Sequence, residues 1–204
     1  MGLYVMGRDY LTAGRNLSER RDRDAISLSS NAPIDHLFCH AAELFMKAAL
    51  IATVPTINVM KYGHRLHCLF GRMEEVNDLG SVLKSTKRAM NQRLGKIERA
   101  FTSADEAARF LAEQETFEKM GGAPLPTVGK DAAIMPRELF HWYGLRHSQK
   151  GGFFRYPMHR HETVPVVEGK DGLVELLPLA LRYWTEEFSD GVYQMCSRAS
   201  TSPN

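Results

Sequence analysis

Hydrophobic and polar positions repeat with a helical period through the first half of the chain. Apolar residues recur three or four positions apart over Ile34–Ile51, which predicts an amphipathic helix with a core-facing stripe. Asn31 suits the N-cap, and Val54-Pro55 ends the helix because proline removes a backbone donor. A second stripe over Leu66–Val76 predicts a helix that begins at Gly63-His64. We expect the two helices to form an antiparallel pair at the centre of a bundle.

The same period predicts further helices on both sides of this pair. They cover residues 3–20, a span from Ser81 to about Phe101, a span from Ser103 to about Lys119, Pro136–Ser148, and a final helix from Pro178. Valines, a Gly-Lys-Asp-Gly turn and leucines predict a β-hairpin near 163–177, with a kinked helix as the alternative. The predicted fold is therefore an all-α bundle of about five to seven helices with this small hairpin insertion. We expect a single domain over 1–196 and a polar tail over 197–204.

Composition narrows the class of protein but points to no partner. The chain has 204 residues, 25% of them charged, and a formal net charge of only +2. Its three cysteines, an odd number, form no disulfide framework and suit a reducing compartment. We find no apolar run long enough for a membrane span, so we expect a cytoplasmic protein. A Gly-rich phosphate loop, a serine-nucleophile elbow and a His-Glu-x-x-His motif are all missing, so no cofactor is predicted.

Three short motifs resemble a known family. The segments HLFCHAAELFMKAALIA and YGHRLHCLF resemble the core helices of HEPN-type proteins, which are small helical domains of prokaryotes. The later GGFFRYP resembles the Arg-Tyr-Pro turn of some uncharacterised HEPN-like groups. The resemblance implies an RNA-directed protein of a defence or toxin–antitoxin system, with a site assembled where two protomers meet. It therefore also implies a homodimer, and it allows an antitoxin-type protein partner.

Arg155 and His161 are the candidate catalytic pair. HEPN ribonucleases have an Arg followed, after four to six residues, by a His, and five residues separate this pair. A guanidinium can hold a phosphate and stabilise its developing charge, while an imidazole can exchange a proton with a ribose 2′-OH or the leaving oxygen. This chemistry needs no metal and gives a 2′,3′-cyclic phosphate. The chain departs from the family because Pro157 and Val164-Pro165 disfavour helix there. The alternative is that Arg155 pairs with a core carboxylate and that His161 lies in an exposed loop.

Basic and aromatic residues alternate between Arg137 and His161. Basic groups bind the phosphate backbone, and exposed rings stack on unpaired bases. The predicted nucleic-acid-binding residues are Arg137, Arg146, Lys150, Arg160 and Tyr156. The simpler interpretation places the aromatic residues of this region in the core and the charges on a hydrated surface. Two further functions therefore stay open: a module that binds RNA or nucleotide without cleaving it, and a structural dimerisation adaptor.

Glu43 is the third candidate catalytic residue. It lies four positions before Lys47 on the helix face away from the apolar stripe. The simple interpretation is a surface ion pair worth a few tenths of a kcal/mol. The sharper hypothesis makes Glu43 a polar member of a HEPN-like site that orients Arg155 or His161.

Histidines and cysteines gather on both predicted central helices. One group is His36, Cys39 and His40, and the other is His64, His67 and Cys68. If the two faces met, zinc could be held by mixed nitrogen and sulfur ligands. Without a Cys-x-x-Cys pair the simpler interpretation is ordinary helix residues, so no metal site is predicted.

Overall fold

The fold is known from a computed structural model that describes residues 1–23, 32–94, 134–148 and 172–201. Its α-helices are α1 (Gly2–Asp22), α2 (Ala32–Thr53), α3 (Leu66–Glu74), α4 (Gly80–Leu94), α6 (Pro136–Ser148) and α7 (Gly172–Thr201). Two short 3₁₀ helices, η1 (Val59–Tyr62) and η2 (Asn77–Leu79), lie on either side of α3. The all-α class is confirmed for the described part of the chain, which contains the six α-helices named above.

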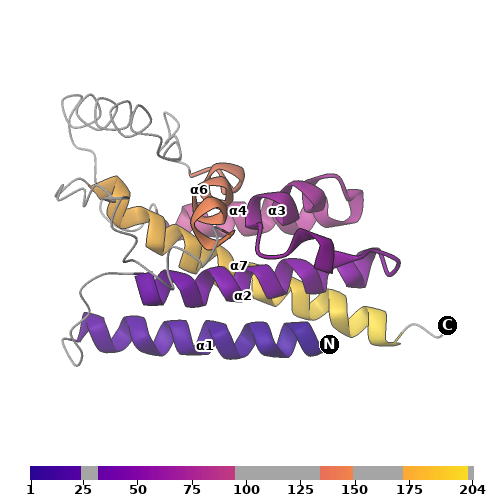
Figure 1. The fold of residues 1–204 in the computed structure, drawn as a ribbon, viewed down its shortest axis with the longest axis horizontal. Coiled ribbons are helices and arrows are strands. Elements are labelled where there is room, and N and C mark those ends of the chain that lie inside the picture. Colours follow the sequence, from indigo (N-terminus) through magenta and orange to yellow (C-terminus); the bar gives the residue numbers. More distant parts are fainter. Residues whose placement is uncertain (24–31, 95–133, 149–171, 202–204) are drawn as a thin grey trace.

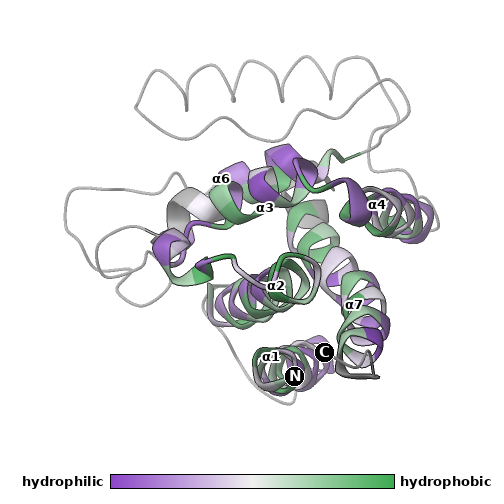
Figure 2. Cartoon of the chain, turned by 90° about the vertical axis from the view of Figure 1, so that its right-hand side faces the viewer, coloured by the Kyte–Doolittle hydropathy of each residue, from purple (hydrophilic) through white to green (hydrophobic). Residues whose placement is uncertain are grey.

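Helix α2 is the centre of the bundle, but α3 is not its main partner. Helix α2 packs chiefly against α1 and α7. Helix α3 packs mostly against α6, and α4 packs mostly against α7. Figure 1 shows α1 and α2 side by side, with α3, α4 and α6 on the opposite side of α2. In the end-on view of Figure 2, the largely hydrophobic α2 lies between α1, α7 and α3. The predicted α2–α3 contact exists, yet the predicted central pair is wrong.

The core is built from the stripes that the sequence indicates. Aromatic rings run through its centre, where the Trp184 ring lies 4.5 Å from the ring centroids of both Phe140 and Phe188. Near the N-terminus, the Tyr4 ring contacts Phe45 with centroids 5.6 Å apart. Burying such side chains is worth roughly 1.5–3 kcal/mol each. This burial is the main term that holds α6 against α7 and α1 against α2.

Glycines allow the closest helix contacts. A Cβ on Gly7 of α1 would lie 2.7 Å from the Phe45 ring of α2. A Cβ on Gly144 of α6 would lie 2.7 Å from His67 Nδ1 and 3.0 Å from the His67 backbone nitrogen of α3. The second contact involves backbone, which cannot move aside like the end of a side chain. Gly144 therefore fixes how closely α6 approaches α3.

The predicted hairpin is corrected for its second arm. Residues 163–171 lie outside the described residues, but Gly172 already begins α7 and Pro178 lies inside the helix. A short apolar run such as Leu173–Leu177 suits a buried strand or a helix equally well. The stripe continues through Ala180, Leu181 and Trp184, all buried, and this packing favours the helix.

Other boundaries differ by small amounts. The helix predicted from Gly63 begins at Leu66, and Ile51, assigned to the core stripe, is 39% exposed. The helix predicted from Ser103 and the N-cap Asn31 lie outside the described residues. The predicted tail over 197–204 begins too early, because α7 continues to Thr201 and only 202–204 lie outside the described residues. Within the described residues, no helix has the length and apolar character required to span a membrane.

Candidate functional site

Polar side chains from three parts of the chain converge on one buried carboxylate. Glu43 of α2 is only 2% exposed. Its Oε1 accepts a hydrogen bond from Lys47 Nζ at 2.6 Å. Its Oε2 lies 2.9 Å from His64 Nδ1 and 2.9 Å from His147 Nε2. His40 Nδ1 lies 3.7 Å from the same oxygen. We call these five residues the Glu43 cluster.

Local structure explains how each member arrives. His40, Glu43 and Lys47 are spaced three and four positions apart, which places them on one face of α2. His64 follows Gly63, whose φ of 53° ends η1 in a left-handed conformation that favours glycine. His147 lies in the last turn of α6, four positions after the buried Tyr143. The turn at Gly63 and the packing of α6 therefore close the cluster over α2.

The rings of the three histidines pack on one another. His40 and His64 are stacked with centroids 5.7 Å apart, and both lie 5.4 Å from the His147 ring. Exposure differs sharply among them. The side chain of His147 is 2% exposed and that of His40 is 17% exposed, whereas that of His64 is 51% exposed. Solvent and ligands therefore reach the cluster through His64.

The electrostatics hold Glu43 ionised. Burial raises the pKa of its carboxyl, but hydrogen bonds from His147, Lys47 and His64 outweigh burial and lower the pKa to about 2. His147 Nδ1 is buried without a hydrogen-bond partner among the described residues. An unpaired acceptor is tolerated better than an unpaired N–H, so we assign the His147 proton to Nε2, from which it donates to Glu43. When His64 likewise donates from Nδ1, its Nε2 keeps a free lone pair.

The surface-pair interpretation of Glu43 and Lys47 is wrong. Lys47 is only 6% exposed, and its ammonium has the Glu43 carboxylate as a buried counter-charge. The sequence shows a polar face on α2 but not what covers it. Here α6 and the segment before α3 cover it, so the ion pair is a buried one whose partners depend on each other.

Most of the predicted RNA-contacting residues fall outside the described residues. These are Arg155, His161, Lys150, Arg160 and Tyr156, together with the side chain of Arg146, which belongs to α6. The remaining one, Arg137, is exposed and makes two hydrogen bonds to Glu74 Oε2, at 2.7 and 2.9 Å. Phe140 and Tyr143 of the same region are buried, so the core interpretation is correct for them.

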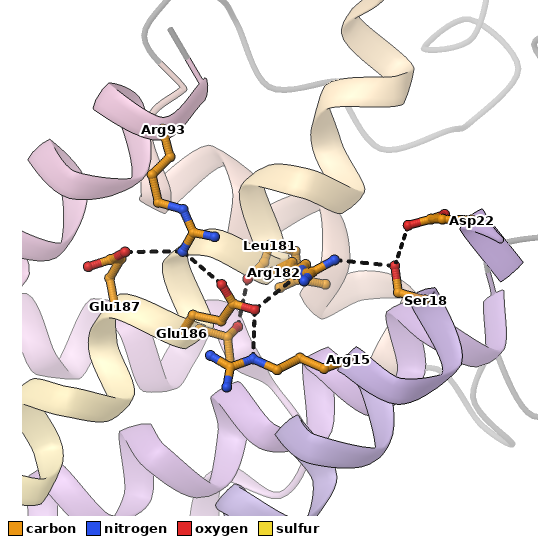
Figure 3. Close-up of polar contacts among 9 residues, drawn as sticks. Arg15, Ser18, Asp22, Arg93, Leu181, Arg182, Glu186 and Glu187 are labelled. Atoms are coloured by element: carbon orange, nitrogen blue, oxygen red, sulfur yellow. Dashed lines mark hydrogen bonds and ion pairs between the residues drawn. The ribbon is translucent and has the colours of Figure 1, made fainter. Parts of the chain in front are cut away.

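A second polar cluster is centred on Glu186 and connects helices. Figure 3 shows Arg15, Arg93 and Arg182 directed at the carboxylate of Glu186, which is 7% exposed. Arg15 Nε and Arg182 Nε donate to Oε1 at 2.8 and 3.0 Å, and Arg93 Nη1 donates to Oε2 at 2.7 Å. Both oxygens are thus occupied by side chains from α1, α4 and α7. The cluster joins these three helices.

The sequence indicated some members of the Glu43 cluster but not the full set. It grouped His40 and His64 as residues of two faces that could meet, and they do. It included Cys39 and Cys68, which do not belong to the cluster, and it gave no role to His147. The signal available for His147 was weak, since the residue lies more than a hundred positions from Glu43.

Comparison of the chain with protein-family models, curated proteins and solved structures finds no match. The resemblance to HEPN-type proteins therefore rests on the three sequence motifs.

Proposed function

We propose that this chain is an RNA-directed protein of the HEPN-like kind and that the Glu43 cluster supplies proton transfer in a metal-independent endoribonuclease. The observation that carries the proposal is the hydrogen bond between Glu43 Oε2 and His64 Nδ1 at 2.9 Å. A carboxylate on one ring nitrogen fixes the tautomer and orients the other nitrogen as a base. His64 is also half exposed, so an RNA strand can reach that nitrogen.

The reaction is a transesterification. His64 Nε2 takes the proton of a ribose 2′-OH while the 2′ oxygen attacks phosphorus, and the bond to the 5′ oxygen breaks. His161 gives the proton that the leaving oxygen needs, and Arg155 stabilises the charge that gathers on the phosphate. The products are a 2′,3′-cyclic phosphate and a 5′-hydroxyl.

Basic residues near His64 support binding of phosphate. Lys61 and Arg65 are exposed on either side of the turn that carries His64. In the sequence, Arg155 comes seven positions after the end of α6, and the last turn of α6 carries His147. Binding without cleavage remains the second function, because Lys61 and Arg65 favour RNA affinity whether or not the phosphodiester is cleaved.

The resemblance also implies a homodimer. Apolar side chains for a subunit contact are present at the N-terminal end of α1 and on α7, where Val5, Met6 and Tyr193 are each about half exposed. The Tyr4 and Tyr193 rings lie 5.7 Å apart, so the exposed Tyr193 of α7 lies beside the N-terminal end of α1. Size-exclusion chromatography with light scattering measures the oligomeric state.

The test is incubation of the purified protein with a mixed-sequence RNA in EDTA. We expect products that end in a 2′,3′-cyclic phosphate, and Arg155→Ala should lower the rate by roughly 10²-fold or more. Arg23→Ala is the matched control, because the Arg23 side chain is 77% exposed at the end of α1 and pairs with Glu19, which is not a member of the cluster. Equal rates for Arg155→Ala and the wild type would contradict the proposal. RNA binding without any products would favour the non-catalytic function.

A further inference from the structure

We propose that the three histidines and Glu43 of the Glu43 cluster also bind one divalent transition-metal ion of the zinc class, and that this ion inhibits proton transfer at His64. The inhibition rests on the proposed function, whereas metal binding does not. The possible ligand atoms of His40, Glu43, His64 and His147 all lie within 4.8 Å of one another.

The distances suit a tetrahedral ion. Bonds of about 2.0–2.1 Å place tetrahedral ligand atoms about 3.3 Å apart. From Glu43 Oε2 the distances to the histidine nitrogens are 2.9 Å for His64, 2.9 Å for His147 and 3.7 Å for His40. These three values lie on both sides of the tetrahedral spacing, and all four ligand atoms lie within 4.8 Å of one another, so rotation of the side chains is what completes the site.

The donor set selects the ion. Three imidazoles and one carboxylate suit zinc, cobalt and nickel, whereas magnesium and calcium prefer oxygen ligands. Lys47 occupies Oε1 of Glu43 and leaves Oε2 facing the histidines, so Oε2 is the carboxylate ligand, while the nearby ammonium lowers the affinity for a cation. Among the described residues no cysteine belongs to this group, so the ion would have nitrogen and oxygen ligands only.

Entry and affinity follow from the burial. His64 provides the exposed side of the cluster, and His147 and Glu43 form its buried side. Metal binding moves the ring proton of His147 from Nε2 to Nδ1, which has no hydrogen-bond partner among the described residues. Zinc sites normally satisfy that second nitrogen. We therefore expect weaker binding of the ion than at structural zinc sites, and this binding should be reversible.

Binding occupies the groups that the reaction uses. An ion held by Oε2 replaces the hydrogen bonds from His64 and His147, so His64 is no longer oriented as a base by Glu43. Zinc should consequently inhibit RNA cleavage, and EDTA should restore it.

The test is calorimetric titration of the EDTA-treated, dialysed protein with Zn²⁺, followed by Co²⁺ with absorption spectroscopy. We expect one ion per chain and a visible Co²⁺ spectrum of a tetrahedral site without a thiolate band. His64→Ala should weaken binding at least about tenfold. His141→Ala is the matched control, since His141 is an exposed histidine of α6 outside the cluster.

Absence of binding, or equal weakening by His64→Ala and His141→Ala, would overturn the metal site. The titration contains no RNA, so it succeeds or fails independently of the proposed function. If zinc binds but RNA cleavage requires the metal, the site stands, and both the inhibition and the metal-independent mechanism fall.

Discussion

The carboxylate of Glu43 and the imidazole of His147 lie 2.9 Å apart, although 104 positions separate the two residues in the chain. This contact joins α2 to the last turn of α6 and buries both side chains. Together with the bond from His64, it places two ring nitrogens on one carboxylate oxygen. The Glu43 cluster is therefore a product of tertiary packing, and its stability depends on every helix that covers α2.

Removing the counter-charge of Glu43 should destabilise the fold. Lys47→Met leaves a buried carboxylate without its ammonium partner, and such a loss costs about 3–5 kcal/mol. Urea unfolding measures the difference in free energy of unfolding. In the double variant Glu43→Gln/Lys47→Met the loss should be smaller than the sum of the two single losses, since no charge is left unpaired. Additive losses would show that the two side chains do not interact.

The approach of α6 to α3 should depend on Gly144. Gly144→Ala places a methyl group against the His67 backbone and should cost about 1–3 kcal/mol through overpacking. Gly71→Ala in α3 is the control, because a Cβ at Gly71 meets nothing within 4 Å. Helix propensity predicts that the control gains about 0.5–1 kcal/mol. The unfolding temperature should therefore fall for Gly144→Ala and rise for Gly71→Ala. Shifts of the same sign in both variants would be inconsistent with the packing described.

The stability of the bundle should fall in acid partly through Glu186. Burial raises the pKa of this carboxyl, but hydrogen bonds from Arg15, Arg182 and Arg93 outweigh burial, and the pKa lies below its ordinary value of 4.5. A lowered folded-state pKa gives stability that is present above 4.5 and is lost as the pH falls through the folded value.

Glu186→Gln removes this titration. The free energy of unfolding of the variant should decrease less between about pH 6 and pH 3 than that of the wild type. Other carboxyl groups, such as Glu43, titrate in both proteins, so the difference between the two curves reports Glu186. Parallel curves would mean that the Arg15, Arg93 and Arg182 contacts do not stabilise the ionised form.

The local hydrophobic pattern was sufficient to predict the helices, but it was not sufficient to predict which helices pack against each other. The stripes at Ile34–Ile51 and Leu66–Val76 predicted helices because burial of one face imposes a period of 3.6 residues. The same stripes do not specify which helix lies opposite, so α3 was paired with α2 where α1 and α7 are the main partners. At 172–177 the short apolar run fitted two structures, and the packing of α7 decided between them.

The candidate site was predicted in part for the same reason. Glu43 and His40 could be recognised because they share one face of α2, and His64 because it lies just before α3, and these are local features. The burial of Glu43 and the participation of His147 depend on where α6 lies, and one sequence contains no record of that contact. The roles of Arg155 and His161 remain predictions from the motif.

The most direct test of the account is RNA cleavage in EDTA by His64→Ala, with and without added imidazole. His64 is half exposed, so its removal should leave the fold intact, as circular dichroism would verify. General base catalysis is worth about 10²–10⁴-fold, and we predict a fall of that size that imidazole partly restores. His141→Ala should cleave at the wild-type rate. A His64→Ala protein that cleaves RNA as fast as the wild type, or a wild-type protein that cleaves none, would contradict the claim that Glu43 holds His64 as the proton acceptor.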